Sequence, residues 1–349
     1  MAEIVIIGGG LTGLSAAYQL ERLGVPYTLI EVKARLGGSI RTHRESGFVL
    51  DGTHFLLEAP RPRPWLDDLG LGDALIPVDT PDGPRVCFRD GTESLIDALR
   101  ARLTGTLLTR MAVSSLGPLK PDASDPGPMG VCLENGVLLE ARGVIVTAPA
   151  RYAGHMLYTL APEPSLYLDA YRYDSIARVS LGFRRADLSQ HPHPLTLSLL
   201  SEAGATVIFH KTSTLRDTFP LSPLAGKALA WERGAGGEGA ESILPTRLPP
   251  DHLLIHAAVR LEGDLRTPDD ALRHLRSFYP AEPVVTWAHH WPESDPLSRD
   301  LPGHAATMDA LDVALPPSVL VAGSDYRAVT LDQQVEQGMD VARRLVAQI

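Results

Sequence analysis

The residues of this sequence that point most directly to chemistry are three glycines spaced as G-x-G-x-x-G, at Gly8, Gly10 and Gly13. Gly8 allows a tight turn, Gly10 lets the backbone approach a pyrophosphate, and Gly13 lets the following helix pack closely on a strand. Such a helix, opened here by Leu11 and Thr12, offers free N–H groups and a partial positive charge to phosphates. The spacing therefore predicts a dinucleotide site.

Glu31 is the acidic residue that completes this pattern, 18 residues after Gly13. At the end of a strand, its carboxylate can accept both hydroxyl groups of an adenosine ribose. The same charge would repel a ribose 2′-phosphate, which argues against NADP.

A β-α-β unit is needed to position these residues, and the surrounding sequence supplies one. Residues 4–7 are four β-branched residues in a row, which is typical of a buried parallel strand. Apolar residues then recur at helical spacing up to Leu23, and Gly24 ends the helix. Residues 27–30 form the second strand. A glycine-rich turn alone is weak evidence, but strand, turn, helix, strand and acid occur here in order.

Composition excludes several classes of protein. The chain has 349 residues, a formal net charge of −10, 44% hydrophobic and 21% charged residues, so we expect a soluble globular protein of one large or two smaller domains. The acidic balance disfavours nucleic acid as a partner. Two cysteines, Cys87 and Cys132, predict neither a disulfide framework nor a metal site. No apolar run approaches the roughly 20 residues of a membrane span and no signal peptide is evident, which favours a cytoplasmic location.

A second glycine pair follows the acid, within the segment E-V-K-A-R-L-G-G-S-I-R-T at residues 31–42. This segment resembles the extended flavin fingerprint of the amine oxidase, protoporphyrinogen oxidase and phytoene desaturase superfamily, where the acid is followed by R-x-G-G-R/K and a threonine. The resemblance implies FAD as the cofactor. It places Arg35 on the adenosine and phosphate side and brings Gly37 and Gly38 close to the pyrophosphate.

Ser39 departs from that fingerprint, since the family usually has arginine or lysine there. One positive charge is thereby lost. Arg41 either replaces it or is a solvated loop cation, and the sequence favours neither.

Residues 47–55, G-F-V-L-D-G-T-H-F, resemble the family's strand under the isoalloxazine ring. The resemblance implies that the backbone at Gly52 touches the ring, with Thr53 and His54 beside it. For His54 a packed, hydrogen-bonded role is favoured over that of a catalytic acid or base.

The middle of the chain is less informative. Residues 60–64 predict an extended, proline-rich linker, and only about 25 residues stand where most relatives have a long helical insert. Residues 94–103 predict a helix that matches a family motif. By position Val113 resembles the valine whose backbone pairs with adenine, and Trp287, five residues before Pro292, resembles the family's ring-contacting W-x-x-x-x-P. Sheet packing is an equally good interpretation of Trp287. Further predicted strands are 86–89, 107–116, 130–133, 143–149, 177–183, 195–200, 206–210, 227–232 and 253–259, with a helix at 268–278 and a flexible loop at 234–239.

The C-terminal segment is informative again. Residues 318–325 predict a strand that ends in Gly323 and Asp325, and a helix follows from Leu331. In flavoproteins such an acid hydrogen-bonds the ribityl chain, and such a helix directs its N-terminus at the flavin O2. Residues 323–338 align without a gap to the corresponding segment of protoporphyrinogen oxidases. Thr330 stands where monoamine oxidases have an aromatic-cage tyrosine, which weakens the amine interpretation.

These motifs predict an α/β fold with a Rossmann-like FAD-binding domain of the glutathione-reductase type and a mixed α+β substrate domain on an antiparallel sheet. The FAD-binding domain would comprise residues 1–58, 86–155 and 300–349, and the substrate domain 59–85 and 156–299. The residues expected to contact FAD are Gly8, Gly10, Leu11, Thr12, Gly13, Glu31, Val32, Arg35, Gly37, Gly38, Ser39, Gly52, Thr53, His54, Val113, Trp287, Gly323, Asp325, Thr330 and Leu331.

The expected function is that of an FAD-dependent oxidase or dehydrogenase. A bulky, planar or conjugated small molecule would give a hydride to flavin N5 where the domains meet, and O2 or another acceptor would reoxidise the flavin. Alternatives are an amine-oxidase-like or renalase-like enzyme, a non-oxidative flavoprotein of the UDP-galactopyranose mutase type, and a flavin-binding protein without turnover. The sequence names no catalytic acid or base, no metal, no substrate and no oligomeric state.

Overall fold

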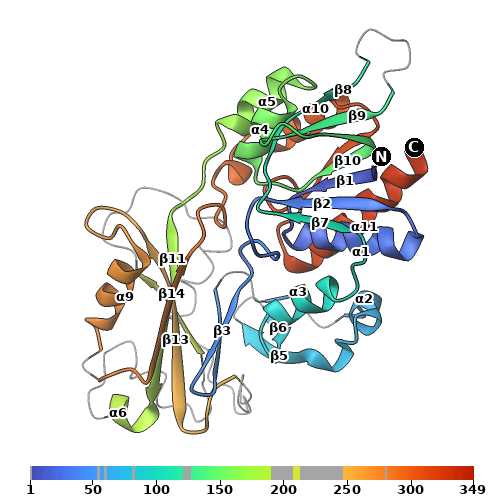
Figure 1. Cartoon of the computed structure of the whole chain (residues 1–349). Coiled ribbons are helices and arrows are strands. Elements are labelled where there is room, and N and C mark those ends of the chain that lie inside the picture. Colours follow the sequence, from blue (N-terminus) through green and yellow to red (C-terminus); the bar gives the residue numbers. More distant parts are fainter. Residues whose placement is uncertain are drawn as a thin grey trace. The chain divides into compact units, whose positions relative to one another are not determined.

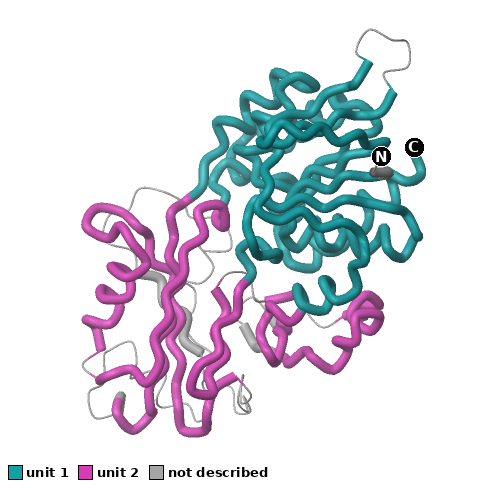
Figure 2. Tube along the Cα trace, viewed as in Figure 1, with its two compact units in different colours: residues 1–40, 95–173, 296–349 teal, residues 41–94, 174–295 magenta. Residues whose placement is uncertain are grey.

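The structure is a computed structural model of the whole chain, and it describes residues 2–52, 56–58, 61–80, 83–120, 127–189, 207–212, 247–279 and 281–349. Contacts divide the chain into two compact units, both discontinuous (Figure 2). Unit 1 comprises residues 1–40, 95–173 and 296–349, and unit 2 comprises residues 41–94 and 174–295. The FAD-binding domain expected from the sequence also includes 41–58 and 86–94, which lie in unit 2. Domain boundaries drawn around cofactor contacts stay a prediction.

Unit 1 is built on a seven-stranded sheet with the order β7-β2-β1-β10-β9-β8, in which β15 also pairs with β10 (Figure 1). Neighbouring strands are parallel from β7 to β10 and between β10 and β15, whereas β8 and β9 return antiparallel. This is the Rossmann-like arrangement predicted from the sequence. The strands are β1 (Ala2–Ile7), β2 (Tyr27–Glu31), β7 (Thr106–Thr109), β8 (Val113–Pro118), β9 (Met129–Leu133), β10 (Leu138–Val146) and β15 (Val319–Val321).

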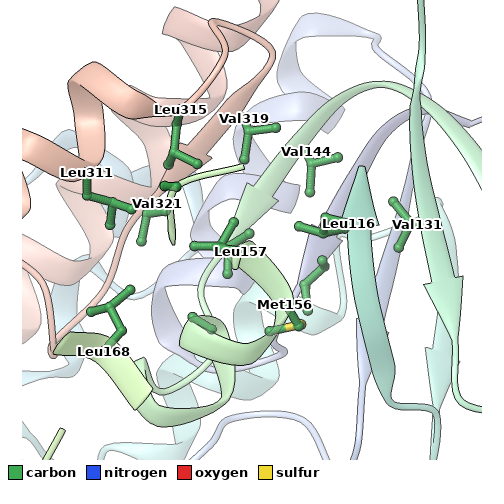
Figure 3. Packing of buried hydrophobic residues seen from close by; sticks show 14 of the residues in the cluster. Leu116, Val131, Val144, Met156, Leu157, Leu168, Leu311, Leu315, Val319 and Val321 are labelled. Carbon is green, nitrogen blue, oxygen red and sulfur yellow. The ribbon is translucent and has the colours of Figure 1, made fainter. Parts of the chain in front are cut away.

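Helices cover both sides of this sheet. On one side α1 and α11 pack against each other so closely that a Cβ atom on Gly338 would lie 2.3 Å from the carbonyl oxygen of Thr12. On the other side α4, α5 and α10 bury apolar side chains against β8, β9, β10 and β15 (Figure 3). The helices of unit 1 are α1 (Leu11–Leu23), α4 (Ala150–Leu157), α5 (Pro162–Asp169), η3 (Ser298–Asp300), α10 (His304–Ala314) and α11 (Leu331–Gln348).

Unit 2 contains a four-stranded sheet with the order β12-β13-β11-β14. Helix α9 covers one face, and apolar residues of the β3–β4 hairpin, Phe48 and Leu50, pack with Leu254 and Val285 of the sheet. The sheet strands are β11 (Ile176–Arg184), β12 (Val207–Thr212), β13 (His252–Arg260) and β14 (Val285–His290). Two hairpins join β3 (Thr42–Glu45) to β4 (Phe48–Asp51) and β5 (Leu75–Thr80) to β6 (Gly83–Phe88), and the helices are α2 (Pro64–Asp68), η1 (Gly72–Ala74), α6 (Arg185–Ser189) and α9 (Pro268–Arg276). Helix α3 (Glu93–Arg100) spans the chain boundary between the units.

Several predicted elements differ from the structure. The single strand expected at 107–116 is two strands, because the chain bends at Arg110, whose φ is 56°, and Arg110 and Met111 donate to carbonyls of Lys33 and Glu31. The strand expected at 318–325 ends at Val321, before a turn at Gly323 with φ 136°.

Two further differences concern unit 2. The expected linker at 60–64 ends in a helix that starts at Pro64, where proline is favourable because its fixed φ suits the first turn. In the sheet, β12 runs parallel to β13, while the other pairs are antiparallel. The expected strands at 195–200 and 227–232 and the loop at 234–239 lie outside the described residues.

Candidate functional site

The first glycine turn of unit 1 has almost no room for side chains. Gly8 donates to the carbonyl of Ile30 at 2.8 Å and has a φ of 109°, which favours glycine. A Cβ atom on Gly13 would lie 2.0 Å from the carbonyl oxygen of Gly8, so α1 could not pack here with any larger residue. Around Gly10, by contrast, such an atom would meet nothing within 4 Å. The open side of the turn is therefore at Gly10.

The second glycine turn lies directly against the first. The Gly37 N–H donates to the carbonyl of Gly9 at 2.7 Å, and Gly37 and Gly38 both have positive φ. A Cβ atom on Gly38 would lie 3.3 Å from the Cα of Gly10. The two turns thus form a backbone cradle that is free of side chains at Gly10 and Gly38.

The Glu31 carboxylate closes one side of this cradle. It is 8% exposed and accepts from the backbone N–H of Gly9 at 2.7 Å and of Lys33 at 2.8 Å. Each oxygen engages one donor and keeps capacity to accept another. This is the pair of acceptors that two ribose hydroxyls need as hydrogen-bond donors.

Arg35 lies beside the second glycine turn, and its expected role on the adenosine and phosphate side of FAD stays a prediction. Its guanidinium donates to the carbonyls of Leu36, Gly38 and Ile40, at 3.0, 2.8 and 3.0 Å, and so braces the second glycine turn from within. Its positive charge remains next to the cradle.

Three further predicted FAD contacts lie around the end of β2. Val32 is 58% exposed and Ser39 is half-buried. Val113 begins β8, shortly after Met111 and Arg110, whose N–H groups donate to the carbonyls of Glu31, the last residue of β2, and of Lys33. The residues present fit a dinucleotide cofactor. The two glycine turns leave space that a Cβ atom would take from a pyrophosphate, and the Glu31 carboxylate beside them can accept hydrogen bonds from a ribose.

At the C-terminal motif, Asp325 already has partners within the protein. It is 3% exposed, and its carboxylate accepts from the Ala150 N–H at 2.8 Å and from the Tyr173 hydroxyl. Burial raises the pKa of this carboxyl, and the hydrogen bonds oppose that effect. No sequence pattern indicated Tyr173 as a partner, because the two residues are 152 positions apart.

Thr330 and Gln333 form a capping box at the start of α11. The Thr330 hydroxyl accepts from the Gln333 N–H at 3.2 Å, and the Gln333 amide oxygen accepts from the N–H groups of Val329 and Thr330. Leu331 is buried, and Gly323 donates to Gln337 further along the helix at 2.9 Å. The box thereby fixes the first turn of α11 and the loop before it.

In unit 2, Gly52 lies against an aromatic stack. A Cβ atom there would be 2.8 Å from His289 and 3.0 Å from Trp287. The Trp287 ring is stacked on His289, with centroids 5.5 Å apart and planes inclined by 4°, and on His43 at 5.8 Å and 12°. Thr53 and His54, the neighbours of Gly52, lie outside the described residues. Packing against this stack explains why a glycine stands at position 52. The sequence did not predict the stack, because β3 and β14 were not among the predicted strands.

A buried ion pair stands immediately before Gly52. Asp51 accepts from Arg247 at 2.8 Å and also from Thr42 and Thr92, and the Asp51 and Arg247 side chains are 1% and 2% exposed. This network joins β3 and β4 to Thr92 and to Arg247, which precedes β13 in the chain. Its role is structural, because the carboxylate and the guanidinium are both enclosed.

The described part of the chain offers no group of three or more histidine, cysteine or carboxylate side chains that could hold a metal ion. None of its helices is long and apolar enough to cross a membrane.

Comparison with known proteins gives two family matches. Residues 6–69 match the NAD(P)-binding Rossmann-like domain, and residues 65–346 match the flavin containing amine oxidoreductases. The second match covers most of the chain.

Individual relatives match over short segments. The chain is 40% identical over 82 residues to coproporphyrinogen III oxidase of Bacillus subtilis, and 39% identical over 71 residues to protoporphyrinogen oxidase 2 of Arabidopsis thaliana. It is 49% identical over 44 residues to the L-amino-acid oxidase of Vipera ammodytes ammodytes. These segments cover 21%, 20% and 13% of this chain and only 17%, 14% and 9% of the relatives.

A crystal structure resembles the whole chain. It is that of a protein from Exiguobacterium sp. 255-15 with a provisional assignment as a protoporphyrinogen oxidase, at a TM-score of 0.69 and 16% identity over 99% of both chains. At this identity the likeness concerns the fold.

Proposed function

Since the chain belongs to the family of flavin containing amine oxidoreductases, we propose that it is an FAD-dependent oxidoreductase that takes a hydride from a bulky, planar or conjugated organic substrate. The observation that carries the proposal is the cradle of two glycine turns closed by Glu31. When bound, FAD supplies a two-electron acceptor that O2 or another oxidant can regenerate.

The protein's own residues would bind and orient the cofactor. Gly10 and Gly38 admit the pyrophosphate, and the N–H groups at the start of α1 face its charge. Glu31 accepts hydrogen bonds from the ribose hydroxyls, while Arg35 stabilises the second turn by donating to its backbone carbonyls. The capping box of Thr330 and Gln333 keeps the start of α11 rigid, so that its partial positive charge keeps a fixed direction.

The substrate class is supported by the tetrapyrrole oxidases among the relatives, named for coproporphyrinogen and protoporphyrinogen. An amine or amino-acid substrate is the second candidate, favoured by the similarity to the Vipera L-amino-acid oxidase. Thr330, which is not aromatic and caps a helix, argues for the first class.

The test is cofactor content followed by anaerobic reduction. The purified protein should carry FAD that acid precipitation releases completely into the supernatant. Covalent attachment is not expected at Cys87, since burial raises the pKa of its thiol to about 11 and leaves little reactive thiolate. Porphyrinogens, the reduced tetrapyrroles for which these relatives are named, should then bleach the flavin under anaerobic conditions by giving up a hydride. Absence of flavin, or FMN in its place, would refute the proposal.

A further inference from the structure

The side chain of Asp325 is enclosed by donors from three segments of unit 1. Its carboxylate accepts from the Tyr173 hydroxyl and from the N–H of Ala150 at 2.8 Å. The Ser324 hydroxyl adds a third donor at 3.3 Å, and the Tyr171 hydroxyl donates to the backbone carbonyl of Asp325 at 2.9 Å. Ala150 is the first residue of α4, and the partial positive charge of a helix N-terminus favours a carboxylate. With only 3% of the residue exposed, Asp325 is held from inside the protein.

A further series of contacts joins Asp325 to the first glycine turn. The next residue, Tyr326, donates its hydroxyl to the carbonyl of Ala148 at 2.8 Å, and Ala148 follows Thr147 just after β10. The Thr147 hydroxyl donates to the carbonyl of Gly8 at 2.9 Å. A Cβ atom on Gly8 would lie 2.9 Å from the backbone nitrogen of Ala148. These two residues after β10 therefore lie between Asp325 and the turn that is expected to hold the pyrophosphate.

Tyr173 is itself fixed by its neighbours. It is the last residue of unit 1 before the chain enters unit 2, and it forms an antiparallel bridge with Pro296, where the chain returns to unit 1. Beside this bridge, the N–H of Leu297 donates to the carbonyl of Arg172 at 2.9 Å. The Arg151 guanidinium lies 4.7 Å from the centroid of the Tyr173 ring, within the range of a cation–π contact. A hydroxyl on a ring held in this way can fix the carboxylate that it bonds.

We propose that Tyr173 is a positioning residue for the cofactor: its hydroxyl fixes Asp325, and Asp325 and Tyr326 fix the segment that supports the first glycine turn. This assignment rests on the proposed function, because it takes that turn as part of the FAD site. It requires no contact between Tyr173 and FAD. Coupling of this kind is carried by contiguous hydrogen-bonded networks, and its size is measured by combining mutations.

The experiment measures how tightly the holoprotein holds FAD when the Tyr173 hydroxyl is removed. FAD that dissociates on dilution of the purified holoprotein is followed by its fluorescence, which gives a Kd at pH 7. Tyr173→Phe keeps the ring and should weaken FAD binding about fivefold, as mutations within such networks do. Tyr158→Phe removes the hydroxyl of an exposed tyrosine at the end of α4 and should leave the Kd unchanged. Equal Kd values for the parent and Tyr173→Phe would overturn the inference.

A double-mutant cycle shows whether Tyr173 acts through Asp325. Asp325→Asn should itself weaken FAD binding, because the carboxylate is lost. Adding Tyr173→Phe to Asp325→Asn should then cost little further affinity, since the two residues act as a unit. If Tyr173→Phe weakens FAD binding by the same factor in both backgrounds, Tyr173 does not act through Asp325, and the inference is wrong.

The pH profile of FAD binding gives a readout that a loss of stability alone would not change. Burial raises the pKa of Asp325, and the Tyr173 hydrogen bond opposes this effect. Without that hydrogen bond the pKa should rise further, so FAD binding should weaken at a higher pH in Tyr173→Phe than in the parent as the pH is lowered. Identical profiles would contradict the proposal. The other charged or titratable groups that act on Asp325 are unaltered in this variant: Tyr171, Tyr326 and Arg299.

Two outcomes separate this inference from the proposed function. A parent protein without FAD refutes both, whereas a parent that holds FAD, with equal affinity in Tyr173→Phe, refutes this inference alone. If Tyr173→Phe fails to fold, Tyr171→Phe decides, since the Tyr171 hydroxyl donates to the backbone of the same aspartate. Tyr171→Phe should weaken FAD binding in the same direction, and in that case an unchanged affinity refutes the inference.

Discussion

At the scale of single residues, Glu31 combines two tasks that a mutation can separate. Its carboxylate holds the first glycine turn through Gly9 and Lys33 and is the expected acceptor of the ribose hydroxyls. Glu31→Ala should weaken FAD binding by about 1–3 kcal/mol, while the fold stays intact because Glu31 ends a strand. Glu31→Gln, which keeps an acceptor, should lose less.

Flavin fluorescence titration of the apoprotein measures this effect. Glu163→Ala, at an exposed acid in α5, serves as the control for the loss of one negative charge. If Glu31→Ala holds FAD as tightly as the parent, Glu31 only stabilises its strand end.

Substitution by alanine should have different effects at two glycines of the first turn: it should lower stability at Gly13 and impair FAD binding at Gly10. Gly13→Ala would force a Cβ atom to 2.0 Å from the carbonyl oxygen of Gly8, so it should destabilise the protein by about 1–3 kcal/mol or more. Gly10→Ala meets no atom within 4 Å and has a φ of −75°, so the free energy of unfolding of the apoprotein should hardly change. It should nevertheless impair FAD binding, because the methyl group occupies the open side of the turn.

Urea unfolding of the apoproteins and FAD titration together check this contrast. A Gly10→Ala protein that binds FAD like the parent would show that the pyrophosphate lies elsewhere.

At the scale of elements, the unit 2 sheet contains a titratable group that links stability to pH. His256 of β13 is fully buried, and burial lowers its pKa to about 4. A folded-state pKa below the unfolded value means that the folded protein binds fewer protons. The resulting stability is fully present above about pH 6.5 and is lost as the pH falls towards 4, by up to about 3 kcal/mol.

Urea unfolding at pH 7 and at pH 4.5, for the parent and for His256→Gln, isolates this contribution. The parent should lose more stability between the two pH values than the variant does. An identical loss in both proteins would mean that the pKa of His256 is the same in the folded and the unfolded protein, so that its burial does not link stability to pH.

The elements also show what a sequence can and cannot predict. The β1-α1-β2 unit was predictable because turn geometry, helix spacing and a buried strand are all local signals. The helix expected at 268–278 was predictable for the same reason, and the structure has α9 there, which begins at a capping box of Thr267 and Asp270. In contrast, β14 carries aromatic and histidine side chains on a half-buried strand, and neither apolar alternation nor a turn signal marks its bounds.

Hydrogen-bond partners that lie far apart in the sequence could not be predicted either. The bonds of Asp325 to Tyr173 and of Asp51 to Arg247 connect positions more than 150 residues apart. Their residue types match many possible partners, and only the assembled fold selects one. The cradle was therefore foreseeable from the sequence, whereas the aromatic stack at Gly52 and these long-range pairs were not.

At the scale of the whole molecule, the residues expected to hold FAD are distributed over both compact units. The glycine turns, Glu31 and the C-terminal motif belong to unit 1, while Gly52 and Trp287 belong to unit 2. Mutations in either unit are therefore expected to affect cofactor binding, so FAD content has to be measured for every variant before its substrate preference is compared.

Small primary amines should be poor substrates of this protein. Thr330 is not aromatic and uses its hydroxyl to cap α11, so it offers no aromatic wall for an ammonium-bearing substrate. Under anaerobic conditions, benzylamine should leave the flavin absorbance unchanged over minutes, while dithionite bleaches it fully and shows that the cofactor is reducible. Rapid bleaching by benzylamine would contradict the prediction and would favour an amine oxidase.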